Sequence, residues 1–295
     1  MTTTDNVPSP SAQLAAEIGL TPIGRQPSLS TYIHSLWARR YFLVAFARSQ
    51  LQAENNESRL GQIWQVLNPL LNAAVYFLIF GVLFEQKNKI PNFLSYLVCG
   101  VFIFSFTQRT ILSGAKSITS NIGLVRALHF PRAVLPLATA MEELLKTGSS
   151  LAVLALIILA QREPLSLTWL QLPVILLMQL AFSVGIAFFF ARLTAKVRDV
   201  AQFLPFAMRI WMYLSGVMYP LTALIARLNE SGLNVAAWLM TINPAAVYID
   251  LVRGSLMATA PAAPVNWIYG LVWAVVAFTF GFLFFWRAEA SYGRG

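Results

Sequence analysis

The chain has 295 residues, of which 57% are hydrophobic and only 11% are charged, and its mean hydropathy is +0.64. Soluble domains carry about 25% charged residues, so this composition excludes a water-soluble globular fold and indicates several membrane spans. The net charge of +9 would suggest nucleic acid binding in a soluble protein, but multispanning proteins collect basic residues on the cytoplasmic side, so no nucleic-acid partner is expected.

The N-terminal region divides into two parts. Residues 1–30 are rich in Thr, Ser and Pro and lack the apolar core of a secretory signal, which predicts a disordered cytoplasmic tail. Over 31–51, apolar residues recur at helical spacing around Arg39 and Arg40, which predicts an amphipathic helix lying in the plane of the cytoplasmic interface. The polar run 54–57 favours a break before the first span, and a simple extension of that span is the alternative.

A helix needs about 20 mostly apolar residues to cross the hydrocarbon core of a bilayer. Six segments reach that length: 63–84, 93–112, 134–160, 167–191, 200–226 and 265–286. The predicted fold class is therefore all-α, with one integral membrane domain over 31–288 and a cytoplasmic tail over 289–295. Basic residues are concentrated in alternate connections, which predicts that both termini are cytoplasmic.

The segment from Val197 to Pro220 reads VRDVAQFLPFAMRIWMYLSGVMYP. A charged Arg198-Asp199 step precedes a mostly apolar run that ends in Met-Tyr-Pro. This pattern resembles the fifth span of the type-2 ABC-transporter permeases, the membrane subunits that export polymers, lipids or drugs with ATP hydrolysed by a separate subunit.

The start of the first span indicates which branch of this family the chain resembles. Leu60, Gly61, Trp64 and Pro69 in RLGQIWQVLNPLL are similar to the pattern by which the Wzm-like, polysaccharide-exporting branch of this family begins its first span. The resemblance, including the six-span plan, covers about residues 31–286 of the chain.

The loop between the second and third spans reads NIGLVRALHFPRAVLP. A short helix with Leu124 and Leu128 four residues apart would present an apolar knob, and Pro131 would end it. This segment resembles the family's coupling helix, a cytoplasmic element that docks into a cleft of the ATPase, whereas a loop helix lying on lipid is the alternative. The resemblance implies ATPase contacts by Leu124, Val125, Arg126, Leu128, His129 and Phe130.

The segment 219–264 is interrupted by polar residues and is too broken to span again. Its apolar pieces, 221–228 and 235–242, are predicted to be re-entrant half-helices that dip into the outer leaflet before the last span. Asn243-Pro244 followed by Arg253 matches the family's NP and Arg positions. The resemblance therefore implies an external gate, with an ordinary external loop as the alternative. The gate residues are predicted to be Met218, Tyr219, Pro220, Asn243 and Pro244.

Several charged residues fall within or beside the predicted spans. Glu142 and Lys146 have the favourable four-residue spacing with the acid first, and Glu143 and Arg109 are candidates for a second ion pair between helices. Structural pairing is the favoured interpretation. The alternative is binding of a lipid pyrophosphate at the cytoplasmic leaflet. Its candidate contacts are Arg39, Arg40, Arg109 and Lys146.

Aromatic residues on two spans are candidates for a sugar pathway, because a ring face stacks on the apolar C–H face of a sugar. They are Tyr76 and Phe77 on the first span and Trp211, Tyr213 and Tyr219 on the fifth. Packing or placement at the membrane interface is the alternative for each of them.

The sequence holds no motif for ATP hydrolysis or another catalytic reaction. A P-loop needs G-x-x-x-x-G-K-[ST], and the nearest approach, Gly114-Ala115-Lys116-Ser117, has no glycine directly before the lysine. No zinc-protease or nucleophile-elbow motif is present, and Cys99 is the only cysteine. The chain is therefore expected to be a transporter subunit rather than an enzyme, with no metal or cofactor of its own.

Taken together, the resemblance implies a homodimeric, channel-forming permease in the bacterial inner membrane, coupled to two Wzt-like ATPase subunits that bind ATP and magnesium. Its substrate would be a polyprenyl-pyrophosphate-linked polysaccharide, with galactan preferred and O-antigen, teichoic acid or capsule next. Two alternatives stay open: a permease for small molecules or drugs, and a membrane enzyme that uses polyprenyl phosphate.

Overall fold

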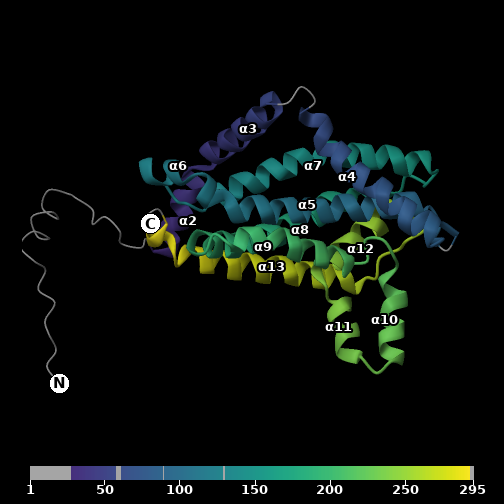
Figure 1. Ribbon diagram of the computed structural model, residues 1–295. Helices are drawn as coiled ribbons and strands as arrows, with labels where there is room; N and C mark the ends of the chain where they lie inside the picture. Colours follow the sequence, from purple (N-terminus) through teal and green to yellow (C-terminus); the bar gives the residue numbers. More distant parts are fainter. Residues whose placement is uncertain (1–27, 58–60, 89, 129, 293–295) are drawn as a thin grey trace, which may run out of the picture.

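The computed structural model describes residues 28–57, 61–88, 90–128 and 130–292, so most of the predicted tail over 1–30 lies outside the described residues. The described part is entirely helical (Figure 1). Its α-helices are α2 (Leu29–Ala38), α3 (Arg40–Glu57), α4 (Gly61–Tyr76), α5 (Phe93–Ser120), α6 (Ile122–Ala127), α7 (Val134–Ala160), α8 (Leu172–Lys196), α9 (Val200–Tyr213), α10 (Leu221–Glu230), α11 (Asn234–Thr241), α12 (Pro244–Leu256) and α13 (Val265–Trp286). Short helical turns cover η1 (Phe77–Leu83), η2 (Gln86–Asn88), η3 (Leu167–Gln171) and η4 (Glu289–Ser291).

Five helical segments of the described chain are long and apolar enough to cross a membrane, which confirms an all-α membrane protein. They are α4 continued into η1, α5, α7, η3 with α8, and α13. The pair α11 and α12, bent by 54°, is a sixth candidate if both helices form one span.

The predicted continuous span over 200–226 is wrong, because α9 ends at Tyr213 after 14 residues. At a rise of about 1.5 Å per residue, such a helix is about 21 Å long, short of the hydrocarbon core. The chain then turns through Gly216, whose φ of +65° lies in the left-handed region that favours glycine, and α10 begins at Leu221. Apolar composition alone does not distinguish this turn from a continued helix.

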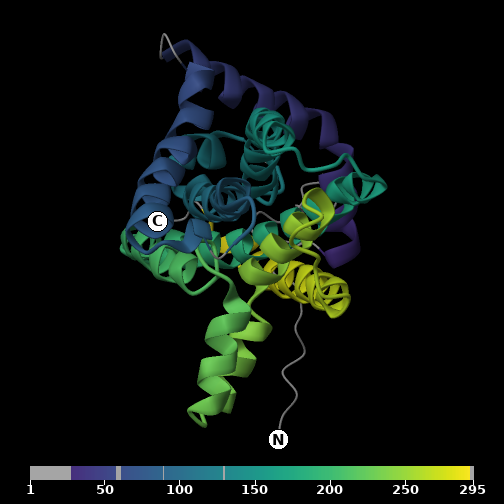
Figure 2. The same cartoon turned by 90° about the vertical axis from the view of Figure 1, so that its right-hand side faces the viewer.

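Helix α5 occupies the middle of the bundle, with the other long helices arranged around it (Figure 2). The helices α8 and α13 cross with their backbones in close contact, where Gly185 of α8 faces Gly281 of α13. A Cβ atom on Gly281 would collide with the backbone of Gly185, so this crossing depends on small residues, as is common between membrane helices.

The two ends of the bundle differ in structure (Figure 1). At one end, called the α6 end, α2 and α6 gather with the C-terminal end of α13. At the opposite end, called the α12 end, α10 and α11 form a hairpin that projects sideways from the bundle in both views. These two helices correspond to the half-helices predicted over 221–228 and 235–242.

The N-terminal region contains two helices rather than the single helix predicted over 31–51. The break falls at Arg39, whose N–H bonds back to the carbonyls of Leu36 and Trp37, and α3 then packs along α7. Residues 54–57, predicted to break the helix, remain within α3 because polarity alone does not end a helix that has a neighbour to pack against.

The predicted C-terminal tail also differs from the structure. Glu289 and Tyr292 are buried, and the Tyr292 ring stacks on Phe285 with 4.7 Å between the ring centroids. The segment 289–292 is therefore part of the folded α6 end.

Candidate functional site

The predicted coupling element is a short helix at the α6 end of the bundle. Its Val125 is buried, Leu124 is partly buried against the same apolar cluster, and Phe130 packs beside them. Leu128 is 48% exposed and lies beyond the helix in an extended conformation. Leu124 and Leu128 therefore do not share a helical face as predicted, because α6 ends at Ala127. Arg126 is exposed, and His129 lies outside the described residues.

A buried hydrogen-bonded cluster ties this element to both ends of the chain. The Tyr32 hydroxyl of α2 donates to Glu289 Oε2 at 2.8 Å and accepts the Ala133 N–H at 3.1 Å. The Arg132 N–H donates to Glu289 Oε1 at 2.9 Å. Burial raises the pKa of Glu289, although these hydrogen bonds and the Arg132 charge oppose that rise. A movement of the chain after α6 would therefore be transmitted to α2 and to the end of α13.

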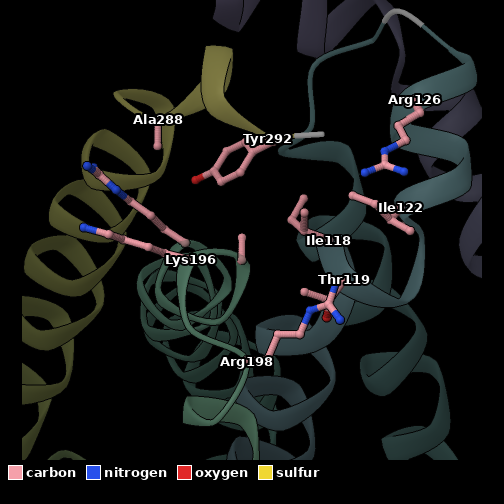
Figure 3. A pocket seen from close by; sticks show the side chains of 10 residues that line it. Ile118, Thr119, Ile122, Arg126, Lys196, Arg198, Ala288 and Tyr292 are labelled. Carbon is pink, nitrogen blue, oxygen red and sulfur yellow. The ribbon is translucent and has the colours of Figure 1, made fainter. Parts of the chain in front are cut away.

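A basic cavity of about 410 Å³ lies beside α6 (Figure 3). Arg126 extends into it from α6, and Arg198 extends into it from the connection between α8 and α9. Lys196 extends toward α13 at its edge, and Arg192 donates to the Phe284 carbonyl. Of the ten described residues that line the cavity, none is acidic.

Four charged residues form a buried network between α5 and α7. Lys146 Nζ lies 2.8 Å from Glu142 Oε1 and 3.5 Å from Glu143 Oε1, and Arg109 Nε lies 3.3 Å from Glu143 Oε2. Ser113 Oγ also donates to Glu143 at 3.2 Å. Two cations thus meet two carboxylates, which supports structural pairing. Arg109 and Lys146, predicted as pyrophosphate contacts, both lie against Glu143.

The other two predicted pyrophosphate contacts lie at the junction of α2 and α3. The Arg40 guanidinium lies over the Tyr41 ring at 4.4 Å and the Trp37 ring at 5.4 Å. Both rings are largely exposed. This combination of exposed aromatic rings and a cation suits a membrane interface.

At the α12 end, the buried Arg253 of α12 binds the turn that follows α9. Its Nη1 donates to Gly216 O at 3.1 Å, and its Nη2 donates to Val217 O at 2.8 Å and to Tyr96 O at 3.0 Å. The guanidinium also lies 3.3 Å from the centroid of the Tyr96 ring. Since a helix end leaves carbonyls without partners, Arg253 supplies donors where α9 stops.

Asn243 holds the same turn from the other side. Its Nδ2 donates to Leu214 O at 3.0 Å, and its Oδ1 accepts the Trp211 Nε1–H at 2.9 Å and the Ala245 N–H at 3.1 Å. Asn243 thereby caps α12, and Pro244 takes the first helical position, where its missing N–H costs nothing.

The predicted gate residues therefore lie close together. Met218 is 1% exposed in the turn and Pro220 precedes α10, while the Tyr219 hydroxyl donates to Tyr213 O at 2.7 Å. The set Arg253, Asn243 and this turn is called the turn clamp below.

The predicted pathway aromatics have different surroundings. Trp211 is held by its bond to Asn243 and packs edge-on against Phe104, with ring centroids 5.8 Å apart. Phe77 packs on Phe93 at 5.9 Å. Tyr76 donates to the Met212 sulfur, and Tyr213 is 45% exposed. Packing explains Trp211 and Phe77, so Tyr76 and Tyr213 are the stronger pathway candidates.

Glu163 connects three loops at the α12 end. It accepts hydrogen bonds from Asn92 Nδ2 at 2.6 Å, Thr259 Oγ1 at 2.7 Å and the Ala258 N–H at 3.0 Å. Burial alone would raise the pKa of Glu163, but these hydrogen bonds together hold it below its ordinary value.

Glu163 therefore stabilises the fold mainly at pH values above the ordinary glutamate pKa of about 4.3. As the pH falls through the lowered folded-state pKa, this contribution is lost. We expect the thermal unfolding midpoint of Glu163→Gln, compared with the wild type between about pH 7 and about pH 3, to show the largest deficit at neutral pH. Glu230→Gln, at an exposed glutamate, is the control, and an unchanging Glu163→Gln deficit across this range would contradict the assignment.

Sequence reasoning missed several of these residues. Glu289 and Tyr292 were placed in a tail, and Arg198 was noted as part of the fifth-span motif rather than as a cavity residue. Glu289 is buried against Tyr32 and Arg132, which lie far away in the sequence, and a pattern of neighbouring residues does not contain that information.

Comparison with known proteins identifies relatives of most of the membrane domain. Residues 41–257 match the family described as ABC-2 type transporter. The chain is 28% identical over 247 residues to the O-antigen export system permease protein RfbA of Myxococcus xanthus, an alignment that covers 82% of this chain and 92% of that protein. It is 26% identical over 208 residues to the O-antigen export system permease protein RfbA of Klebsiella pneumoniae, covering 70% of this chain and 76% of that protein.

Proposed function

Because the chain belongs to the ABC-2 type transporter family, we propose that it is the permease subunit of an ATP-driven polysaccharide exporter. The observation that carries this proposal is its similarity, over 82% of its length, to an O-antigen export system permease. Five apolar helices long enough to span a membrane support a multi-pass protein, and the proposed location is the bacterial inner membrane.

In this proposal the α6 end faces the cytoplasm and the α12 end faces outward, so both termini are cytoplasmic. An ATPase of the ABC class, with its own ATP and magnesium, binds at α6. Two copies of the chain and two ATPase subunits form the transporter, and the substrate path lies between the copies. The buried cluster of Tyr32, Arg132 and Glu289 supports this arrangement, because it links the ATPase contact to α2.

The substrate is proposed to be a glycan carried on a polyprenyl pyrophosphate, with galactan as the first candidate and O-antigen, teichoic acid or capsule as the others. The turn clamp at the outer end would act as the external gate, with Tyr76 and Tyr213 contacting the sugars. Depleting the chain from its cells tests this proposal, because lipid-linked glycan should then accumulate on the cytoplasmic face. An unchanged distribution of lipid-linked glycan would contradict it.

Leu128 gives a direct test of the ATPase contact, because it is exposed and its substitution leaves the packed side of α6 intact. Leu128→Asp places a charge in an apolar docking surface, so we expect the co-purified ATPase to fall at least about tenfold, since a hot-spot contact is worth about 2 kcal/mol. The measurement is the ratio of ATPase to permease after purification in mild detergent.

Leu233→Asp is the matched control, since Leu233 is 55% exposed at the opposite end of the bundle. Equal ATPase recovery in both variants would contradict the assignment of α6 as the docking element.

A further inference from the structure

We propose that the basic cavity beside α6 binds the phosphate group of an anionic lipid and thereby controls the position of α6. This inference rests on the proposed function only for its orientation, in which the α6 end is cytoplasmic. The cavity is lined by residues from α5, α6, the end of α8 and the segment after α13 (Figure 3). A ligand there would contact four parts of the chain at once.

The charges of the cavity favour a phosphate group. Arg126 and Arg198 enter it from two different elements, and Lys196 lies at its edge (Figure 3). Guanidinium groups bind phosphate oxygens through paired hydrogen bonds. Four of the ten described residues that line the cavity are basic and none is acidic, so the cavity attracts an anion.

The remaining lining favours a lipid over a free anion. Ile118, Ile122, Ala195 and Ala288 supply aliphatic surface next to the cations. The cavity also lies where α8 and α13 end, at Lys196 and Trp286, which is the level expected for lipid headgroups. Basic pockets between helices on the cytoplasmic side of a membrane are typical sites for anionic headgroups.

Two buried groups beside the cavity have partners of their own. Glu289 accepts hydrogen bonds from Tyr32 and Arg132, and the Tyr292 hydroxyl donates to Phe285 O at 3.1 Å. These contacts hold the Glu289 carboxylate at the Tyr32 and Arg132 side of the α6 end. A lipid phosphate held by both arginines would tie α6 to the connection between α8 and α9.

The experiment compares lipid retention by the full chain and three double variants. Native mass spectrometry of the purified protein, titrated with phosphatidylglycerol or with zwitterionic phosphatidylcholine, measures bound lipid. The wild type should retain phosphatidylglycerol preferentially. Lys196→Gln with Arg198→Gln should weaken that retention about 25-fold, since each cation near a membrane surface contributes about fivefold.

Two further double variants are controls for charge loss outside the cavity and for misfolding. Lys116→Gln with Arg287→Gln removes the same charge from exposed positions that do not line the cavity, and should retain lipid like the wild type. Lys196→Arg with Arg198→Lys preserves the charge and should retain binding, which separates loss of charge from misfolding. Equal retention of phosphatidylglycerol by both glutamine double variants would overturn the proposal.

Competing probes identify the source of the phosphate group. Displacement of phosphatidylglycerol by undecaprenyl pyrophosphate would support the site and assign it to the substrate lipid. Failure of that lipid to compete would support a resident phospholipid. Cross-linking of Arg198→Cys to an acidic segment of the ATPase, with no lipid retained by the wild type, would overturn the lipid proposal while leaving the exporter proposal intact.

Discussion

Replacing Arg253 by alanine is expected to destabilise the protein by about 3–5 kcal/mol, because it leaves the buried carbonyls of Tyr96, Gly216 and Val217 without their charged donor. The turn after α9 should then lose its fixed shape. Thermal unfolding in detergent measures the loss of stability. Arg253→Lys should recover only part of it, since an ammonium cannot reach three carbonyls with the geometry of a planar guanidinium.

Gly100→Ala tests the same contact from the opposite side. A Cβ atom at Gly100 would lie 2.6 Å from Arg253 Nη2 and 2.9 Å from Val217 O, so the guanidinium or the turn must move. Gly148→Ala is the matched control, because nothing lies within 4 Å of the added Cβ and alanine favours a helix. If Gly100→Ala unfolds at the same temperature as Gly148→Ala, the turn clamp does not hold the turn in place.

Replacing Glu143 by alanine should have an effect of similar size. This carboxylate faces both Arg109 and Lys146 in a buried network, and removing one partner of a buried pair costs about 3–5 kcal/mol because it leaves a charge uncompensated. Thermal unfolding in detergent again provides the measurement, and Glu230→Ala, at an exposed glutamate, provides the control.

The double variant Arg109→Leu with Glu143→Leu distinguishes pairing from other causes. If the two residues stabilise each other, the double variant should be less destabilised than the sum of the single variants. Additive losses would indicate that Arg109 and Glu143 do not stabilise each other. That result would favour the alternative in which Arg109 binds a ligand such as a pyrophosphate.

The prediction of spans from the sequence succeeded where one uninterrupted apolar helix is long enough to cross a membrane. The helices α5, α7, α8 and α13 all fall within predicted spans or extend them, because length and apolar composition decide such helices. The family assignment from the Val197 to Pro220 segment is likewise confirmed by the ABC-2 type transporter match.

The prediction failed where a contact distant in sequence decides the local structure. The end of α9 depends on Arg253 and Asn243, which lie about 30 to 40 residues further along the chain. In the same way, the buried Glu289 is bound by Tyr32 and Arg132, which lie far away in the sequence. The apolar residues over 200–226 do not by themselves indicate that α9 ends at Tyr213.

The α6 segment lies between these two cases. Its position and its few helical residues were predicted, but the orientation of its side chains was not. Val125 packs inward and Leu128 faces out beyond the helix end, so the exposed surface differs from the predicted pair of leucines. Burial against the cluster that includes Phe130 decides this orientation.

The proposed function requires this chain to move a lipid-linked glycan across the membrane only with an ATPase partner. It is tested by placing the chain and its co-purified ATPase in inside-out vesicles and following protection of lipid-linked glycan from an added glycosidase. Glycan should become protected only when ATP and both subunits are present. Glycan that stays accessible under these conditions, or that is modified by the chain alone, would contradict it.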